Sequence, residues 1–283
     1  MFTVDAHVHL WDPAARAYPF LDSPALAALR RPLAIDDLRR TAALTGADAA
    51  VLVQAIPDED ETLDLLARAA DSGGLVAAVV GWVDLGAPDV SRRLERMVSA
   101  PGGVRLRGIR HPVQGEPDPG WLDRADVRRG IAAVGAAGLV YELLVKEPQW
   151  AAAARLARDL EVPLVLDHAG NPPIAGGDLR SWTSWLRRLV AAGPHVRVKL
   201  SGLVTLADPR RCTVEDLQPW VDTLLEVAGP DRVMAGSDWP ICELASPPEQ
   251  VWEAYSSLLQ GLSVEERSAV LGGTAVRTYR IDA

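Results

Sequence analysis

Short apolar runs recur eight times along this chain of 283 residues, each followed by a stretch with the spacing of an amphipathic helix. This alternation constrains the fold most, because near-continuous apolar runs are typical of parallel strands covered on both faces. Eight strands alternating with helices over this length predict an α/β protein, a (β/α)8 or TIM barrel formed as a single domain by residues 1–283. The predicted strands are Phe2–Leu10, Ala47–Ile56, Leu75–Leu85, Val104–Val113, Gly138–Val145, Pro163–Gly170, Val196–Leu203 and Arg232–Pro240.

Helices are predicted over Asp58–Asp71, Gln149–Leu160 and Asp178–Ala192 from their apolar spacing and end signals. Thr213 and Ser263 each indicate a further helix start, the second with the pattern of a capping box. A doubly wound sheet is the alternative, but it would carry a glycine-rich phosphate loop after the first strand. This chain has H-V-H-L-W-D-P at that place, which favours the barrel.

The charge and the cysteine content narrow the class of protein. A net charge of -9 argues against sequence-independent binding to nucleic acid or to an anionic membrane, but it does not exclude an anionic substrate held by arginines. The expected partner is a small-molecule substrate. Cys212 and Cys242 cannot form a disulfide framework, and no apolar stretch approaches 18 residues. The first strand starts at residue 2, which leaves no room for a signal peptide. We therefore expect a cytoplasmic protein, monomeric or homodimeric.

Two histidines in the first strand point to a metal or a catalytic site. His7 and His9 lie two positions apart, so their side chains share one face of the strand. Two imidazoles on one face form half of a divalent-metal site, although histidines satisfied inside a core are the alternative. The segment Trp11–Leu33, rich in Pro and Ala, is predicted to be a long loop after this strand.

Polar and aromatic residues gather where the predicted strands end, which is where barrel enzymes carry their chemistry. Four of the five histidines lie there, whereas His195 precedes a strand and is expected at the opposite rim. The residues at the strand ends are His7, His9, Gln54, Trp82, Arg110, His111, Glu142, His168, Lys199, Ser201 and Asp238.

Five local phrases occur in an order that resembles a known family: V-D-A-H-V-H-L-W-D-P, G-I-R-H, L-D-H-A-G-N-P, K-L-S-G-L and G-S-D-W-P. They resemble the amidohydrolase superfamily, and within it the lactonase-like branch of the amidohydrolase-2 type, the fuconolactonase and rhamnonolactonase group. The resemblance runs from residue 4 to about residue 280, where 271–279 resembles the helix that closes these barrels.

The resemblance implies a metal-assisted hydrolase. His7, His9, His168 and Asp238 would hold one divalent ion, zinc or manganese, which lowers the pKa of bound water to about 7. Asp238 would also act as the general base. Arg110 ends strand four in place of a bridging lysine or glutamate, so a binuclear centre is not expected. Some relatives work without metal, and this alternative stays open.

The expected reaction is the opening of a small lactone to the hydroxy acid. A sugar-derived γ- or δ-lactone is the first candidate. Asp238, His168, Arg110 and Lys199 are the predicted catalytic residues, with Arg110 or Lys199 holding the developing oxyanion. The predicted substrate-binding residues are Trp11, Trp82, His111, Glu142 and Trp239. Glu142 has a second interpretation, an ion pair with Lys199 or Arg110 across the barrel mouth.

Two other functions are compatible with the same motifs. A metal-dependent decarboxylase of an aromatic or unsaturated acid would use the same residues and release carbon dioxide. A non-catalytic sugar- or metal-binding barrel would need the base position to be lost, whereas Asp238 is present.

Overall fold

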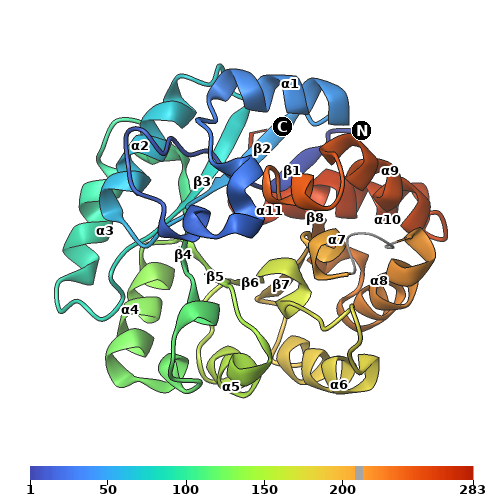
Figure 1. Cartoon of the computed structure of the whole chain (residues 1–283). Helices are drawn as coiled ribbons and strands as arrows, with labels where there is room; N and C mark the ends of the chain where they lie inside the picture. Colours follow the sequence, from blue (N-terminus) through green and yellow to red (C-terminus); the bar gives the residue numbers. More distant parts are fainter. Residues whose placement is uncertain (208–212, 283) are drawn as a thin grey trace.

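The computed structural model describes residues 1–207 and 213–282, and the strands in these residues form one parallel eight-stranded sheet. Each strand pairs with the next along the chain, in the order β1 to β8, and helices surround the strands (Figure 1). The TIM-barrel prediction is confirmed. The strands are β1 (Val4–Val8), β2 (Ala49–Val53), β3 (Val76–Gly81), β4 (Leu106–His111), β5 (Val140–Leu143), β6 (Leu164–Leu166), β7 (Val196–Leu200) and β8 (Val233–Ala235).

The helices between the strands start where the sequence places capping residues. The side chains of Asp58, Asp178, Thr213 and Ser263 each accept a hydrogen bond from the backbone N–H of the first turn that follows. The α-helices of the described residues are α1 (Ile35–Thr45), α2 (Glu59–Ala70), α3 (Val90–Val98), α4 (Ala125–Ala136), α5 (Trp150–Asp159), α6 (Leu179–Val190), α7 (Leu203–Leu206), α8 (Val214–Ala228), α9 (Pro248–Leu258), α10 (Val264–Ser268) and α11 (Thr274–Tyr279).

The barrel is closed between β1 and the segment after β8. Val8 forms an isolated parallel bridge with Trp239. The His9 N–H donates to the Trp239 carbonyl at 2.8 Å, and the Asp238 N–H donates to the His7 carbonyl at 2.9 Å. This closure places the first and last predicted site segments side by side.

Apolar residues are divided between the two faces of the barrel wall. Leu164 and Leu166 of β6 belong to the large cluster that joins strands to helices, whereas Val165 belongs to a second, smaller cluster. Because side chains alternate along a strand, the second cluster fills the barrel interior. Tyr279 of α11 belongs to it, so the last helix closes the interior from one end.

The segment after β1 is more ordered than the predicted loop. It contains two short 3₁₀ helices, η1 (Pro19–Asp22) and η2 (Pro24–Leu29). Its ends meet where the Leu33 N–H donates to the Trp11 carbonyl at 2.8 Å, and the Trp11 indole donates to the Leu29 carbonyl at 3.0 Å.

Two observations concern membrane-spanning helices and cysteines. No helix within residues 1–207 and 213–282 is long and apolar enough to cross a membrane. Cys242 is buried, and Cys212 lies outside the described residues.

Candidate active site

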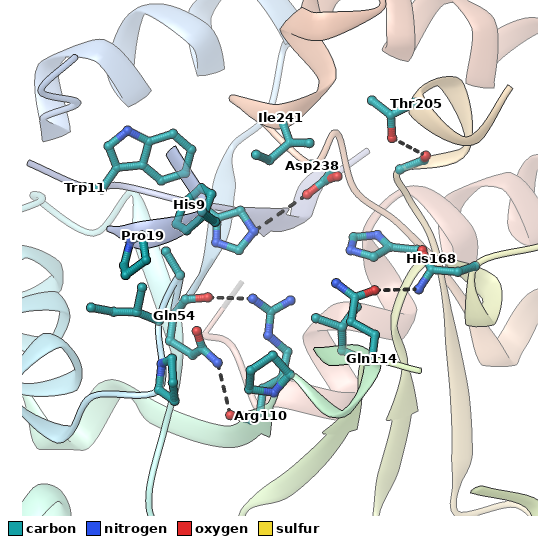
Figure 2. A pocket seen from close by; sticks show the side chains of 18 residues that line it. His9, Trp11, Pro19, Gln54, Arg110, Gln114, His168, Thr205, Asp238 and Ile241 are labelled. Carbon is teal, nitrogen blue, oxygen red and sulfur yellow. Dashed lines mark hydrogen bonds and ion pairs between the residues drawn. The ribbon is translucent and has the colours of Figure 1, made fainter. Parts of the chain in front are cut away.

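A cavity of about 480 Å³ opens at the carboxyl ends of the strands (Figure 2). Five of the predicted site residues line it: His9, Trp11, Arg110, His168 and Asp238. Its volume suits a small molecule, because such sites generally measure about 300–1,000 Å³. The barrel therefore brings residues from β1, β4, β6 and β8 to one cavity, as barrel enzymes do.

His7 and His9 converge as predicted. Their Nε2 atoms lie 3.1 Å apart, and His9 Nδ1 lies 2.8 Å from the Val53 carbonyl. A carbonyl only accepts, so His9 carries its hydrogen on Nδ1 and presents an unprotonated Nε2 to the site. Burial lowers the pKa of both histidines, that of His7 well below its ordinary value, with the charge of Lys199 as the second cause for His7. Both imidazoles are therefore neutral near pH 7.

Asp238 is held in a left-handed conformation with φ of 62°. The preceding residue, Ser237, fixes this turn: its N–H and its hydroxyl donate to the two carboxylate oxygens of Asp5 at 2.8 and 2.6 Å. The Trp239 N–H donates to the Ser237 hydroxyl oxygen at 3.0 Å. Burial raises the pKa of Asp5 to about 6. The contacts of Asp5 therefore aim the Asp238 carboxylate into the cavity.

His168 lies on a second unusual turn. Strand β6 ends at Leu166, earlier than predicted, because His168 and Ala169 adopt φ of 49° and 50° in the short segment η7 (Asp167–Gly170). The ring of His168 lines the cavity, and its Nδ1 lies 2.9 Å from the Ser201 hydroxyl. Both neighbours in the D-H pair consequently lie close to His7, which strand alternation alone would not predict.

Three donor atoms fit one divalent metal ion. Nε2 of His7 and of His9 lie 3.7 and 3.6 Å from Oδ1 of Asp238, and 3.1 Å from each other. Atoms at these separations share a centre about 2 Å from each, which is the usual length of a zinc–nitrogen or zinc–oxygen bond. Nitrogen and carboxylate donors of this kind suit zinc.

The predicted set of four ligands is divided between two overlapping groups. His7, His9 and Asp238 form one, and His7, Asp167 and His168 form the other. His168 is therefore not grouped with His9 and Asp238 around a single point, although its ring centroid lies 4.6 Å from that of His7.

Arg110 joins the cavity to a buried carboxylate. Its Nη1 donates to Asp167 Oδ2 at 3.1 Å and its Nη2 to the Gln54 carbonyl at 2.5 Å. A guanidinium has five N–H donors, so Arg110 keeps donors for a ligand. Burial acts to raise the pKa of Asp167, but the neighbouring cations, Lys199 first, hold it well below its ordinary value. Asp167 is therefore an anion that fixes the position of Arg110.

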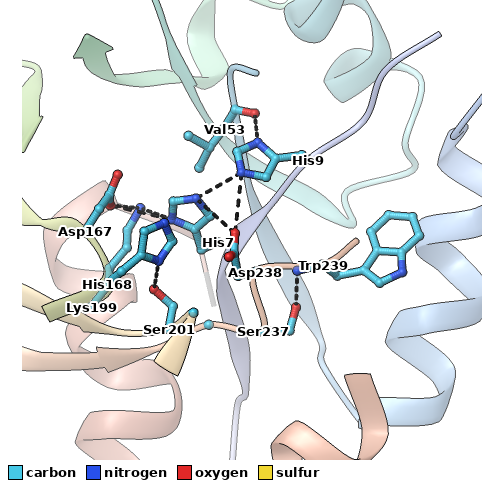
Figure 3. Close-up of polar contacts among 12 residues, drawn as sticks. His7, His9, Val53, Asp167, His168, Lys199, Ser201, Ser237, Asp238 and Trp239 are labelled. Carbon is cyan, nitrogen blue, oxygen red and sulfur yellow. Dashed lines mark hydrogen bonds and ion pairs between the residues drawn. The ribbon is translucent and has the colours of Figure 1, made fainter. Parts of the chain in front are cut away.

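Lys199 and Glu142 lie outside the lining of the cavity, contrary to their predicted roles at the substrate. Both are fully buried, and their side chains form an ion pair of 2.7 Å. The Tyr279 hydroxyl donates to the other oxygen of Glu142. Burial, and next the charge of Asp167, raises the pKa of Glu142 to about 7. The structure thus supports the second interpretation of Glu142, an ion pair with Lys199. Nζ of Lys199 also lies 3.1 Å from Nδ1 of His7 (Figure 3).

Three other residues predicted to bind substrate also lie outside the lining. The Trp82 indole donates to Nδ1 of His111 at 2.9 Å, and Nε2 of His111 contacts Glu116 at 2.7 Å. The indole of Trp239 donates to Glu243 at 2.7 Å. The polar groups of these side chains thus contact other residues of the protein, and the side chains do not line the cavity.

The sequence reasoning missed several residues of the site. Asp167 was overlooked although it directly precedes His168 in the D-H pair. Phe20 comes from η1, and the Asn171 amide contacts Gln114 at 3.3 Å across the cavity wall. Phe20, Gln114 and Asn171 lie in segments without a periodic pattern, so the sequence contains no sign of their place in the site. Only Asp167 could have been predicted, from its position next to His168. His195, as expected, lies away from the cavity and contacts the Ala157 carbonyl at 3.0 Å.

Comparison with known proteins gives a consistent result. A family model described as amidohydrolase matches residues 4–281. The L-fucono-1,5-lactonase of Burkholderia multivorans is 40% identical over 98% of this chain and 96% of that protein. The L-fucono-1,5-lactonase of Burkholderia ambifaria is 34% identical over 99% of this chain and 96% of that protein.

Solved structures agree with the fold. A crystal structure of an amidohydrolase from Burkholderia multivorans with bound zinc covers all of both chains with a TM-score of 0.92 and 38% identity. The 5-carboxyvanillate decarboxylase of Sphingomonas paucimobilis covers 99% of both chains with a TM-score of 0.65, but at 15% identity this likeness shows the fold alone.

Proposed function

This chain belongs to the amidohydrolase family, and on that premise we propose that it hydrolyses a sugar-derived 1,5-lactone, such as L-fucono-1,5-lactone, to the open hydroxy acid. The observation that carries the proposal is the placement of Asp238 and Arg110 on the same cavity, a carboxylate and a guanidinium with donors to spare. Two relatives named L-fucono-1,5-lactonase, at 40% and 34% identity over nearly the whole chain, support the substrate class.

The lining of the cavity suits a polyhydroxylated ring. Trp11 and Phe20 offer apolar surface on one part of the lining, which suits the C–H face of a sugar. Gln114, Asn171 and Thr205 offer amide and hydroxyl groups elsewhere on it. Such a division would orient a lactone whose ring has one apolar face and several hydroxyl groups.

In the first step, Asp238 takes a proton from a water molecule as the water oxygen bonds to the lactone carbonyl carbon. The carbonyl π electrons move onto the carbonyl oxygen, and the free N–H groups of Arg110 donate to this oxyanion. A guanidinium donates through hydrogens that it already carries, so this stabilisation needs no proton transfer.

In the second step, the carbonyl re-forms and the bond between the carbonyl carbon and the ring oxygen breaks. The proton held by Asp238 passes to the departing ring oxygen, which becomes a hydroxyl group. The carboxylic acid product then ionises and releases one proton to the solvent. Ring opening is consequently measurable as acid production.

A divalent ion fits the first ligand group, and His7, His9 and Asp238 would hold it. Such an ion, when bound, polarises a carbonyl or lowers the pKa of water to about 7. The relative with bound zinc supports this ion as the first to test.

We expect Asp238→Asn to lose about 10²- to 10⁴-fold in kcat, because the amide cannot accept the proton of the attacking water. Proton release would be followed with five- and six-membered aldonolactones, above the spontaneous rate, with and without added zinc. Asp231→Asn, at an exposed aspartate before β8, is the matched control and should retain full activity.

No release with any lactone, by the folded wild-type protein in either condition, would overturn the proposal. The decarboxylase alternative would then be tested by carbon dioxide release from aromatic and unsaturated acids. Proton release that persists in Asp238→Asn would support lactone hydrolysis but would show that Asp238 is not the general base.

A further inference from the structure

Lysine is nearly absent from this chain. Of its 29 basic residues only Lys146 and Lys199 are lysines, and the others are arginines. Lys146 is exposed after β5, whereas Lys199 has no exposed surface inside the barrel. An ammonium group is compact with three rotatable donors, and a planar guanidinium cannot replace it in a narrow position. The contacts of Lys199 therefore indicate why an ammonium group occupies this position.

Two hydrogen bonds and one ion pair hold the ammonium group of Lys199. Its Nζ lies 2.7 Å from Oε2 of Glu142, 3.1 Å from Oδ1 of Asp167 and 3.1 Å from Nδ1 of His7. An ammonium only donates, so Nδ1 of His7 accepts and carries no hydrogen. A neutral His7 then carries its hydrogen on Nε2, the atom that faces the cavity.

The second imidazole accepts that hydrogen. His9 presents an unprotonated Nε2, because its Nδ1–H donates to the Val53 carbonyl, and the two Nε2 atoms are 3.1 Å apart. Arg110 Nη1 also lies 3.2 Å from Nε2 of His7 and has two hydrogens, one of which goes to Asp167 at 3.1 Å. Its second hydrogen competes with the Nε2–H of His7 for this space, so Arg110 acts against Lys199 on the position of the hydrogen. With the hydrogen of His7 on Nε2, the contacts run from Lys199 through His7 to His9 (Figure 3).

A metal ion needs the opposite tautomer of His7. Nε2 must then be free of hydrogen, and the hydrogen must be on Nδ1, where Lys199 now donates. An acceptor for it is at hand: Oδ1 of Asp167 lies 3.5 Å from Nδ1 and has no hydrogen-bond partner within the described residues.

We propose that Lys199 is a positioning residue that holds His7 in the tautomer unable to bind metal, and so sets the affinity of the site for zinc. Lys199 and Asp167 compete for Nδ1 of His7, the first favouring the metal-free site and the second the metal-bound site. The inference rests on the metal site of the proposed hydrolase and not on its substrate.

Zinc affinity measured against a chromophoric chelator, without lactone, tests the proposal. We expect Lys199→Met to bind zinc at least tenfold more tightly than wild type, and Lys146→Met to stay within twofold of wild type. The double variant Glu142→Gln/Lys199→Met removes both charges of the buried pair and should bind more tightly as well, which guards against misfolding of the single variant. Unchanged or weaker zinc binding by folded variants would overturn the proposal.

Nitrogen-15 NMR of the imidazole rings in wild type tests the tautomer directly, and five histidines keep the assignment simple. We expect Nε2–H for His7 without metal and Nδ1–H with zinc bound. Nδ1–H in the metal-free protein would refute the role of Lys199. Because neither measurement uses a lactone, failure here leaves the proposed hydrolysis untouched, and failure of lactone hydrolysis leaves these results standing.

Discussion

At the scale of single residues, the site depends on a glycine, Gly202, that leaves room for two side chains of the cavity. Gly202 has φ of +66°, and a Cβ atom there would lie 2.8 Å from Nδ1 of His168 and 3.3 Å from Oδ2 of Asp238. Both of these side chains line the cavity. The glycine of the K-L-S-G phrase is therefore explained by the lack of space for a Cβ atom beside His168 and Asp238.

Gly202→Ala should reduce kcat about 10- to 100-fold, because displacement of a catalytic group by about 1 Å can have an effect of this size. The left-handed backbone adds strain of about 1–2 kcal/mol to the folded state. Lactone hydrolysis and urea unfolding would measure the two effects. Gly261→Ala, where nothing lies within 4 Å of the added Cβ, is the control. Full activity in Gly202→Ala would show that the contact with His168 relaxes without cost.

The sequence could predict which residues lie at the cavity where that position follows from a place at a strand end. His9, Arg110, His168 and Asp238 line the cavity as strand-end residues should. Lys199 was placed at the right strand, but its side chain is fully buried and does not line the cavity, since its partners come from β1, β5 and the segment η7 after β6. Such burial depends on which distant side chains meet inside the barrel, and the local pattern does not contain this information.

At the scale of elements, the number and order of strands could be predicted, but their ends could not. Strand β8 was predicted to reach Pro240 and ends at Ala235, because the left-handed turn at Asp238 interrupts it. That turn is held by Asp5, more than 230 residues earlier in the chain. Long-range contacts of this kind override the local preference of the chain.

We expect Ser237→Ala to loosen the closure between β1 and β8. The variant leaves Oδ2 of Asp5 and the N–H of Trp239 without a buried partner, which should cost about 1–3 kcal/mol of unfolding free energy. Urea unfolding measures the loss, and Ser257→Ala on the exposed face of α9 is the control. Equal stability of the two variants would mean that the hydroxyl group does not contribute to the closure.

At the scale of the whole molecule, a buried acid couples stability to pH. Glu61 of α2 accepts the N–H groups of Ala55 and Ile56 at 3.0 Å each, and burial raises its pKa to about 7 from 4.5. Arg16 and Tyr18 face it from the segment after β1. Between these two pKa values the folded state binds more protons than the unfolded state, so the contribution of Glu61 to stability falls as pH rises.

The difference in unfolding free energy between wild type and Glu61→Gln should therefore shift by about 2–3 kcal/mol against wild type from pH 5 to pH 8. Urea unfolding of both proteins at the two pH values measures this shift. The histidines with lowered pKa values act in the opposite direction on both proteins, and the difference cancels them. A constant difference across this range would show that Glu61 ionises normally in the folded protein.

The scarcity of lysine also provides an internal reporter. An amine-directed acylating reagent can reach the side chain of Lys146 in the native barrel, but it cannot reach Lys199, which has no exposed surface. Lys199 becomes reactive only when the barrel interior opens. The rate at which this second lysine is acylated therefore times the opening of the barrel, without any engineered label.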